Sequence, residues 1–214
     1  MIGIYDCFGY GTGYDVSFDE RYKLIKRAGF DCVMLWWSDK FGRGECVDDC
    51  SKNNILTIVI HLPDDTYPLN NMGIERLRAI ISEAESKEIQ IAFENLRNIN
   101  NLSLVLDSFH SRYVGYCYDS CHHKNYAPND DLLKRFGNRL MALHLQDNGG
   151  KHNQHQLPFD GSIDWVEVMN GISLTGYKGA TSLEPMNWDY ECLSIQQFLS
   201  LAYQKAKELN NMRT

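Results

Sequence analysis

Four side chains of the kinds that bind divalent cations stand at the ends of short apolar segments. They are Glu94, Asp119, His144 and Glu184, which end the segments 91–94, 116–119, 142–144 and 182–184. A buried charge at the end of an apolar strand is costly unless an opposite charge accompanies it. Neighbouring segments carry no matching Lys or Arg, so the pattern predicts a cation taken from solution. Three carboxylates and one imidazole suit Mn²⁺, Mg²⁺ or Zn²⁺.

Three further histidines lie near these segments. His61 ends another apolar segment, His122 follows Asp119 by three residues, and His155 lies in the loop after His144. We expect these side chains to bind additional ions or substrate oxygens, or to orient the metal ligands.

The elements that position these side chains alternate along the chain. Strands are expected at 2–5, 32–37, 56–61, 89–94, 113–119, 140–144 and 180–184, and helices at 18–29, 74–87, 102–109, 130–136, 164–174 and 195–209. Ser17 and Glu20 have capping-box spacing before the first helix, and Gly29 is expected to end it. Strands that alternate with helices predict a parallel sheet, and continuous apolar strands predict that both faces are covered.

Two α/β architectures fit this alternation, an open doubly wound sheet and a TIM-type (β/α) barrel. The glycines of Gly9-Tyr-Gly-Thr-Gly13 lack the G-x-G-x-x-G spacing and the following helix of a dinucleotide-binding fold. In a barrel, the C-terminal ends of the strands converge on one mouth, where active sites lie. Since an open sheet would spread the candidate ligands along a line, the sequence favours the barrel.

The bulk composition agrees with one soluble domain over residues 1–214, with 43% hydrophobic and 23% charged residues. The net charge of −7 argues against a nucleic-acid partner, because duplex binding needs a basic face. We find no apolar run long enough for a membrane span and no signal-peptide pattern. Seven cysteines at irregular spacing, without a CxxC pair, are typical of reduced thiols, so we expect a cytoplasmic protein.

Five motifs together resemble the xylose isomerase-like TIM-barrel superfamily, which includes sugar isomerases and epimerases and endonuclease IV-type enzymes. They are Ile91-Ala-Phe-Glu-Asn-Leu96, Tyr116-Cys-Tyr-Asp-Ser-Cys-His122, Leu143-His-Leu-Gln-Asp-Asn148, His155-Gln-Leu-Pro-Phe-Asp-Gly161 and Ser182-Leu-Glu184. The resemblance implies that Glu94, Asp119, His144 and Glu184 bind the catalytic metal. In the epimerase branch it implies that Glu94 and Glu184 also transfer the proton, through an enediolate of a sugar or sugar phosphate. It implies that His122 contacts substrate oxygens.

The endonuclease branch gives an alternative function, repair of DNA at abasic sites. There the resemblance implies further zinc ions, with His61 and Glu94 at one and His122 with an Asp-x-His pair at another. The chain has Asn153-Gln-His155 at that pair, and Asn lacks the charge of Asp. This departure, the short chain and the acidic balance favour the isomerase or epimerase.

The chain departs from the family at one βα unit. The family has eight strands, whereas the sequence predicts seven. Only the 18 residues Ser38–Ile55 separate Trp37 from Leu56, and a complete βα unit needs about 30 residues. We therefore expect a shortened barrel, in which segments 32–37 and 56–61 pair directly or a partner chain of a homo-oligomer covers the gap. The shortening also raises a third functional hypothesis, a metal-binding barrel that has lost its activity.

Overall fold

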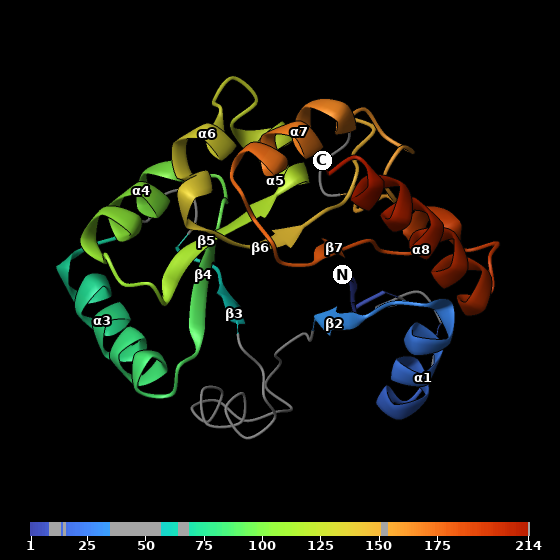
Figure 1. Ribbon diagram of the computed structural model, residues 1–214, viewed down its shortest axis with the longest axis horizontal. Coiled ribbons are helices and arrows are strands. Elements are labelled where there is room, and N and C mark those ends of the chain that lie inside the picture. The colour runs from blue at the N-terminus through green and yellow to red at the C-terminus, as the bar shows by residue number, and fades with distance from the viewer. Residues whose placement is uncertain (9–13, 15, 35–56, 64–68, 151–153, 214) are drawn as a thin grey trace.

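The computed structural model describes residues 1–8, 14, 16–34, 57–63, 69–150 and 154–213. The described residues form seven strands. Within them, a helix follows every strand except β2, as can be traced in Figure 1. The strands are β1 (Ile2–Tyr5), β2 (Cys32–Met34), β3 (Thr57–Ile60), β4 (Gln90–Glu94), β5 (Val114–Asp119), β6 (Leu140–His144) and β7 (Thr181–Leu183). The helices are α1 (Phe18–Ala28), α3 (Asn71–Ser86), α4 (Ile99–Ser108), α5 (Ser120–Tyr126), α6 (Leu132–Phe136), α7 (Trp165–Leu174) and α8 (Ile195–Asn211), with the short 3₁₀ helices η2 (Gly137–Arg139) and η3 (Trp188–Tyr190).

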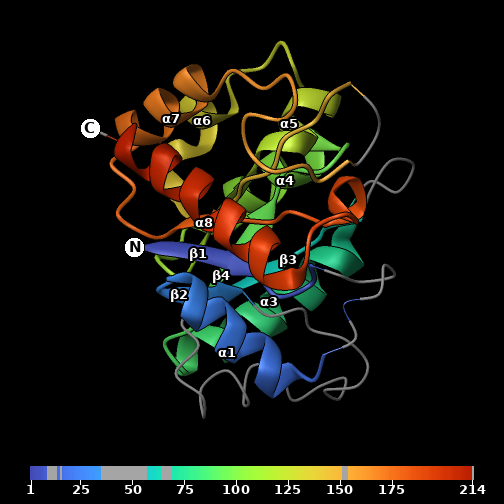
Figure 2. The same ribbon diagram turned by 90° about the vertical axis from the view of Figure 1, so that its right-hand side faces the viewer.

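The strands form a curved parallel array. One sheet has the order β2-β1-β7 and the other the order β3-β4-β5-β6, and every ladder is parallel. The backbone of Leu145 joins the two sheets, because its N–H donates to Ser182 O at 3.0 Å and its carbonyl accepts from Glu184 N at 3.0 Å. In both views, the helices lie on the outside of the curved array of strands (Figures 1 and 2). The predicted TIM-barrel-like α/β fold is therefore confirmed.

Capping residues define the ends of the helices. Ser17 Oγ accepts from Glu20 N at 3.3 Å, and Gly29 ends α1 with φ 109°, a conformation that favours glycine. Ser194 forms a complete capping box with Gln197 at the start of α8. None of the helices in the described part of the chain combines the length and the apolar composition needed to cross a membrane.

Successive side chains of β5 alternate between the outer face, which packs against helices, and the inner face, which carries the candidate ligands. Tyr116 and Tyr118 point outward, and Tyr116 lies edge-on to Phe136 of α6 with ring centroids 5.6 Å apart. Cys117 and Asp119 therefore point to the inside of the barrel. All six residues of β5 are buried, as the continuous apolar pattern predicts for a strand covered on both faces.

Strands β2 and β3 stand at the two ends of the array. Every residue of both strands is only half-buried, unlike those of β5. Among the described residues, no hydrogen-bonded ladder joins β2 to β3. Part of the strand predicted at 32–37 and the segment 38–55 lie outside the described residues, so direct pairing of the two predicted strands and cover by a partner chain both stay predictions.

One α-helix was not predicted from the sequence, whereas the others differ from their predicted ranges only at their ends. Residues 120–126 form α5, directly after β5, where the sequence carries no amphipathic periodicity. Asp119 starts this helix, because its Oδ1 accepts from His122 N at 2.6 Å. The turn brings the His122 side chain back toward the ends of the strands, so this short helix matters for the site.

Candidate metal centre

The C-terminal ends of four neighbouring strands bring the predicted ligands together. Glu94 ends β4, Asp119 ends β5, His144 ends β6, and Glu184 follows β7. Asp119 and His144 are register partners across β5 and β6. All four residues are buried, with exposed fractions between 0% and 8%. The array thus places three carboxylates and one imidazole at the predicted end of the barrel.

Glu94 lies among three histidines. Its Oε1 is 2.8 Å from His122 Nδ1, and its Oε2 is 3.0 Å from both His144 Nδ1 and His61 Nε2. The side chain of His61 is 62% exposed, whereas that of His122 is 13% exposed, so His61 lies at the rim. Two of the three additional histidines predicted from the sequence therefore contact the same carboxylate.

The other two carboxylates meet through an amide. Gln146 Nε2 donates to Asp119 Oδ2 at 2.7 Å and to Glu184 Oε2 at 3.2 Å. Glu184 Oε2 also lies 3.4 Å from His144 Nδ1. His144 therefore has Glu94 on one side and Glu184 on the other.

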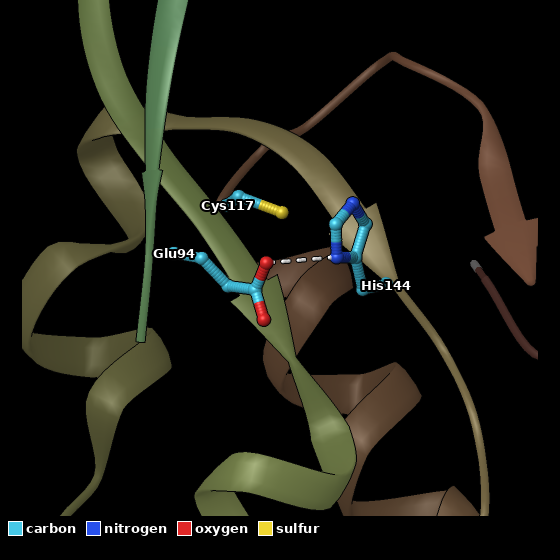
Figure 3. A group of neighbouring side chains, drawn as sticks. All are labelled: Glu94, Cys117 and His144. Carbon is cyan, nitrogen blue, oxygen red and sulfur yellow. Dashed lines mark ion pairs between the residues drawn. The ribbon is translucent and has the colours of Figure 1, made fainter. Parts of the chain in front are cut away.

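The donor atoms form three compact groups, each with its atoms within 4.8 Å of one another. The groups are Glu94, Cys117 and His144; Glu94, Asp119 and His122; and Asp119, His144 and Glu184. Figure 3 shows the first group, with Glu94, the Cys117 sulfur and the His144 ring directed toward one another. Separations of this size allow one cation to contact several donors together.

Two buried imidazole nitrogens test whether a cation fits. Nδ1 of His122 and Nδ1 of His144 lie close to Glu94, yet within the described part of the chain neither contact has hydrogen-bond geometry. A buried polar atom without a hydrogen bond calls for an explanation such as a bound ion. An excess of carboxylates beside such nitrogens matches the chemistry of a divalent metal site, so the donor set fits the predicted metal.

Burial and charge set the pKa values of these groups. Burial raises the pKa of Glu184 to about 8, aided by Glu94 and Asp119 and opposed by His144. Burial would also raise the pKa of Glu94, but the adjacent histidines hold that pKa well below its ordinary value. Burial lowers the pKa of His122, yet Asp119 and Glu94 outweigh this and raise it to about 9. The negative field of the site therefore favours added positive charge.

His155 occupies a different place from the other histidines. Its Nδ1 lies 3.2 Å from the backbone carbonyl of Glu184, and its ring meets Trp188 edge-on with centroids 5.6 Å apart. Burial lowers the pKa of His155. His155 borders the site beside Glu184 and belongs to none of the compact donor groups among the described residues.

Sequence reasoning missed two residues of the site, Gln146 and Cys117. Each is two residues from a predicted ligand, Gln146 after His144 and Cys117 before Asp119. Alternate residues of a strand share a face, so this spacing could have found both. Glutamine carries no charge, and a buried cysteine usually packs as a small apolar residue. The residue type alone therefore did not identify either of them as part of the site.

Comparison with known proteins agrees with this architecture. Residues 65–199 match the family model of the xylose isomerase-like TIM barrel. An uncharacterized protein of Sinorhizobium fredii, y4fM, is 34% identical, and the match covers 72% of this chain and 55% of that protein. The uncharacterized protein MJ1311 of Methanocaldococcus jannaschii is 26% identical over 62% of this chain and 50% of its own. The chain thus spans about half the length of these two relatives.

Solved structures share the fold across the whole chain. An IOLI protein with a bound zinc atom has a TM-score of 0.75 at 14% identity, covering 100% of this chain and 98% of its own. The D-psicose 3-epimerase of Clostridium cellulolyticum H10, solved with D-tagatose, has a TM-score of 0.70 at 14% identity, covering 99% and 97%. Because the family model matches well over half of the 214 residues, the chain belongs to the xylose isomerase-like TIM-barrel family.

Proposed function

We propose that this protein is a divalent-metal-dependent isomerase or epimerase of sugars or sugar phosphates. The observation that carries the proposal is the placement of His144 between two glutamates. Its Nδ1 lies 3.0 Å from Glu94 Oε2 and 3.4 Å from Glu184 Oε2. Two carboxylates that flank a metal ligand such as His144 can remove and return a proton at the carbon next to a substrate carbonyl.

In this proposal, Glu94, Asp119, His144 and Glu184 hold the ion. A bound divalent cation polarises a carbonyl oxygen and stabilises negative charge that develops on it. A ketose as the substrate class is supported by two structures that share the fold, the D-psicose 3-epimerase with D-tagatose and an L-ribulose 3-epimerase. The zinc in the IOLI neighbour supports a divalent metal.

The two glutamates carry the proton transfer. One carboxylate removes the proton α to the carbonyl, which gives an enediolate, and the other carboxylic acid returns a proton. Return to the same carbon from the opposite face gives an epimer, and return to the neighbouring carbon gives an isomer. His122 contacts the substrate oxygens, since its ring lies beside Glu94 and is 13% exposed.

Hydrogen bonds from Asn95 hold the backbone of Asp119 in place, which supports the role of Asp119 as an oriented metal ligand. Asn95 Nδ2 donates to Asp119 O at 2.9 Å, and Asn95 Oδ1 accepts from Asp119 N at 2.8 Å. Tyr116 OH donates to the same Asn95 oxygen at 2.9 Å. Outer partners of this kind orient metal ligands, and their loss costs about 10- to 100-fold in metal affinity.

Metal binding and proton exchange test the proposal together. The protein is stripped with a chelator, reloaded separately with Mn²⁺, Zn²⁺ or Mg²⁺, and incubated in D₂O with D-psicose, D-tagatose, L-ribulose and their phosphates. We expect deuterium at the carbon α to a ketose carbonyl in the loaded protein and none in the stripped protein. Glu94→Gln is expected to weaken metal binding by more than about 100-fold, beyond the effect of an outer partner.

Glu208→Gln is the matched control, since Glu208 is exposed on α8 and should bind metal like the wild type. A stripped protein that recovers no metal would refute the metal site. Metal binding without exchange into any of these ketoses would refute the isomerase or epimerase and leave a metal-binding barrel.

A further inference from the structure

We propose that Cys117 is an additional ligand of the metal, and that its thiolate makes the site prefer Zn²⁺, Co²⁺ or Cd²⁺ over Mg²⁺ or Mn²⁺. This inference rests on the metal site proposed above. It adds a soft sulfur donor to a set of carboxylates and imidazole, which by itself would suit hard and borderline ions alike.

Strand register places the sulfur at the site. Cys117 is the register partner of Glu94 across β4 and β5, and it precedes Asp119 by two residues on the same face. Its side chain is fully buried, and its sulfur lies within 4.8 Å of the ligand atoms of Glu94 and His144. Figure 3 shows the sulfur turned toward both groups.

The neighbouring imidazole gives an independent reason for a ligand here. His144 is 6% exposed, and its Nδ1, which belongs to the same group as the sulfur, lies 3.0 Å from Glu94 Oε2 and 3.4 Å from Glu184 Oε2 without hydrogen-bond geometry. A cation held by Glu94 and His144 would lie within reach of the Cys117 sulfur. Coordination would release the thiol proton to solvent and leave the thiolate bound.

Cys121 provides a matched comparison within the same motif. It is also fully buried, but its sulfur accepts from Asn148 Nδ2 at 3.2 Å and Asn125 Nδ2 at 3.5 Å. It belongs to none of the donor groups found among the described residues. Burial is therefore common to both cysteines, and only the position of Cys117 offers sulfur to the ion.

Spectroscopy of the cobalt-loaded and zinc-loaded full chain tests the inference. Co²⁺ should give visible d–d bands together with a near-ultraviolet sulfur-to-cobalt charge-transfer band. Cys117→Ser should lose the charge-transfer band and lower the preference for Zn²⁺ over Mn²⁺ by about tenfold or more. Cys121→Ser should retain both. X-ray absorption of the zinc-loaded wild type should show sulfur at about 2.3 Å, a readout that needs no variant to fold.

The outcomes separate the two proposals. Absence of any cobalt or zinc binding in the wild type would overturn the metal site itself. Bound metal without sulfur scattering, or a charge-transfer band that survives Cys117→Ser, would overturn the thiolate ligand alone and leave the carboxylate and imidazole site standing.

Discussion

Glu184→Gln is expected to lower exchange of the substrate α-proton by about 10²- to 10⁴-fold, the usual contribution of a general acid or base. The amide keeps the size of the carboxyl group but can neither accept nor return a proton at neutral pH. Hydrogen exchange in D₂O, followed by NMR on a ketose that the wild type processes, measures the loss directly.

Metal content must be measured on the same samples, because Glu184 is proposed as a ligand as well as an acid/base group. Exchange is therefore compared at saturating metal, with Glu208→Gln as the control for an exposed glutamate. Asp119→Asn separates the roles further, since it should weaken metal binding and recover most of the exchange once metal is saturating. Unchanged exchange in Glu184→Gln would remove Glu184 from the proposed acid/base pair.

The strand ends were predictable because an unpaired charge after an apolar run is costly. Glu94, Asp119 and His144 each end a strand in the structure, and Glu184 follows β7 by one residue. Parallel strands have their C-terminal ends at the same edge, so residues that end successive strands lie close together in space. The contacts of His144 with Glu94 and Glu184 could not be derived, since register depends on which strands become neighbours.

Short-range geometry explains what the sequence did not reveal. Helix α5 begins because Asp119 accepts from His122 N, and no periodic pattern announces so short a helix. Gln146 bridges Asp119 and Glu184 through its amide. Because glutamine is uncharged, its burial does not call for a cation, and the charge argument did not identify it. The sequence did not predict these features because they depend on contacts in the folded chain rather than on residue type.

The part of the array where the sequence predicts a missing βα unit lies away from most of the candidate ligands. Strands β4, β5, β6 and β7 are consecutive neighbours, whereas β2 and β3 stand at its ends. Among the candidate site residues, only His61 directly follows one of those end strands, and it is exposed. If the βα unit is absent as the sequence predicts, metal binding should therefore be affected less than the positioning of a substrate.

A buried carboxylate holds the loop that carries His155. Asp147 is fully buried, and its two oxygens accept four hydrogen bonds. The donors are Asn148 N at 2.7 Å, Ile163 N at 3.1 Å, Phe159 N at 2.9 Å and Trp165 Nε1 at 2.7 Å. His155 and Phe159 have φ of 47° and 71°, which non-glycine residues adopt only at a cost of about 1–3 kcal/mol each. The Asp147 hydrogen bonds stabilise this loop against that cost.

Asp147→Ala is accordingly expected to lower the free energy of unfolding by about 3–5 kcal/mol, since it leaves several donors without an acceptor. Asp164→Ala is the matched control, because among the described residues the Asp164 side chain accepts a single hydrogen bond, from Glu167 N as the cap of α7, and its loss should cost about 1 kcal/mol. Urea unfolding measures both losses, and Asp147→Asn, which keeps one acceptor oxygen, should fall between them. Limited proteolysis should cut Asp147→Asn within residues 154–163 faster than the wild type. Equal losses in Asp147→Ala and Asp164→Ala would contradict the anchoring role, because the four-bond carboxylate would then stabilise no more than a single exposed cap.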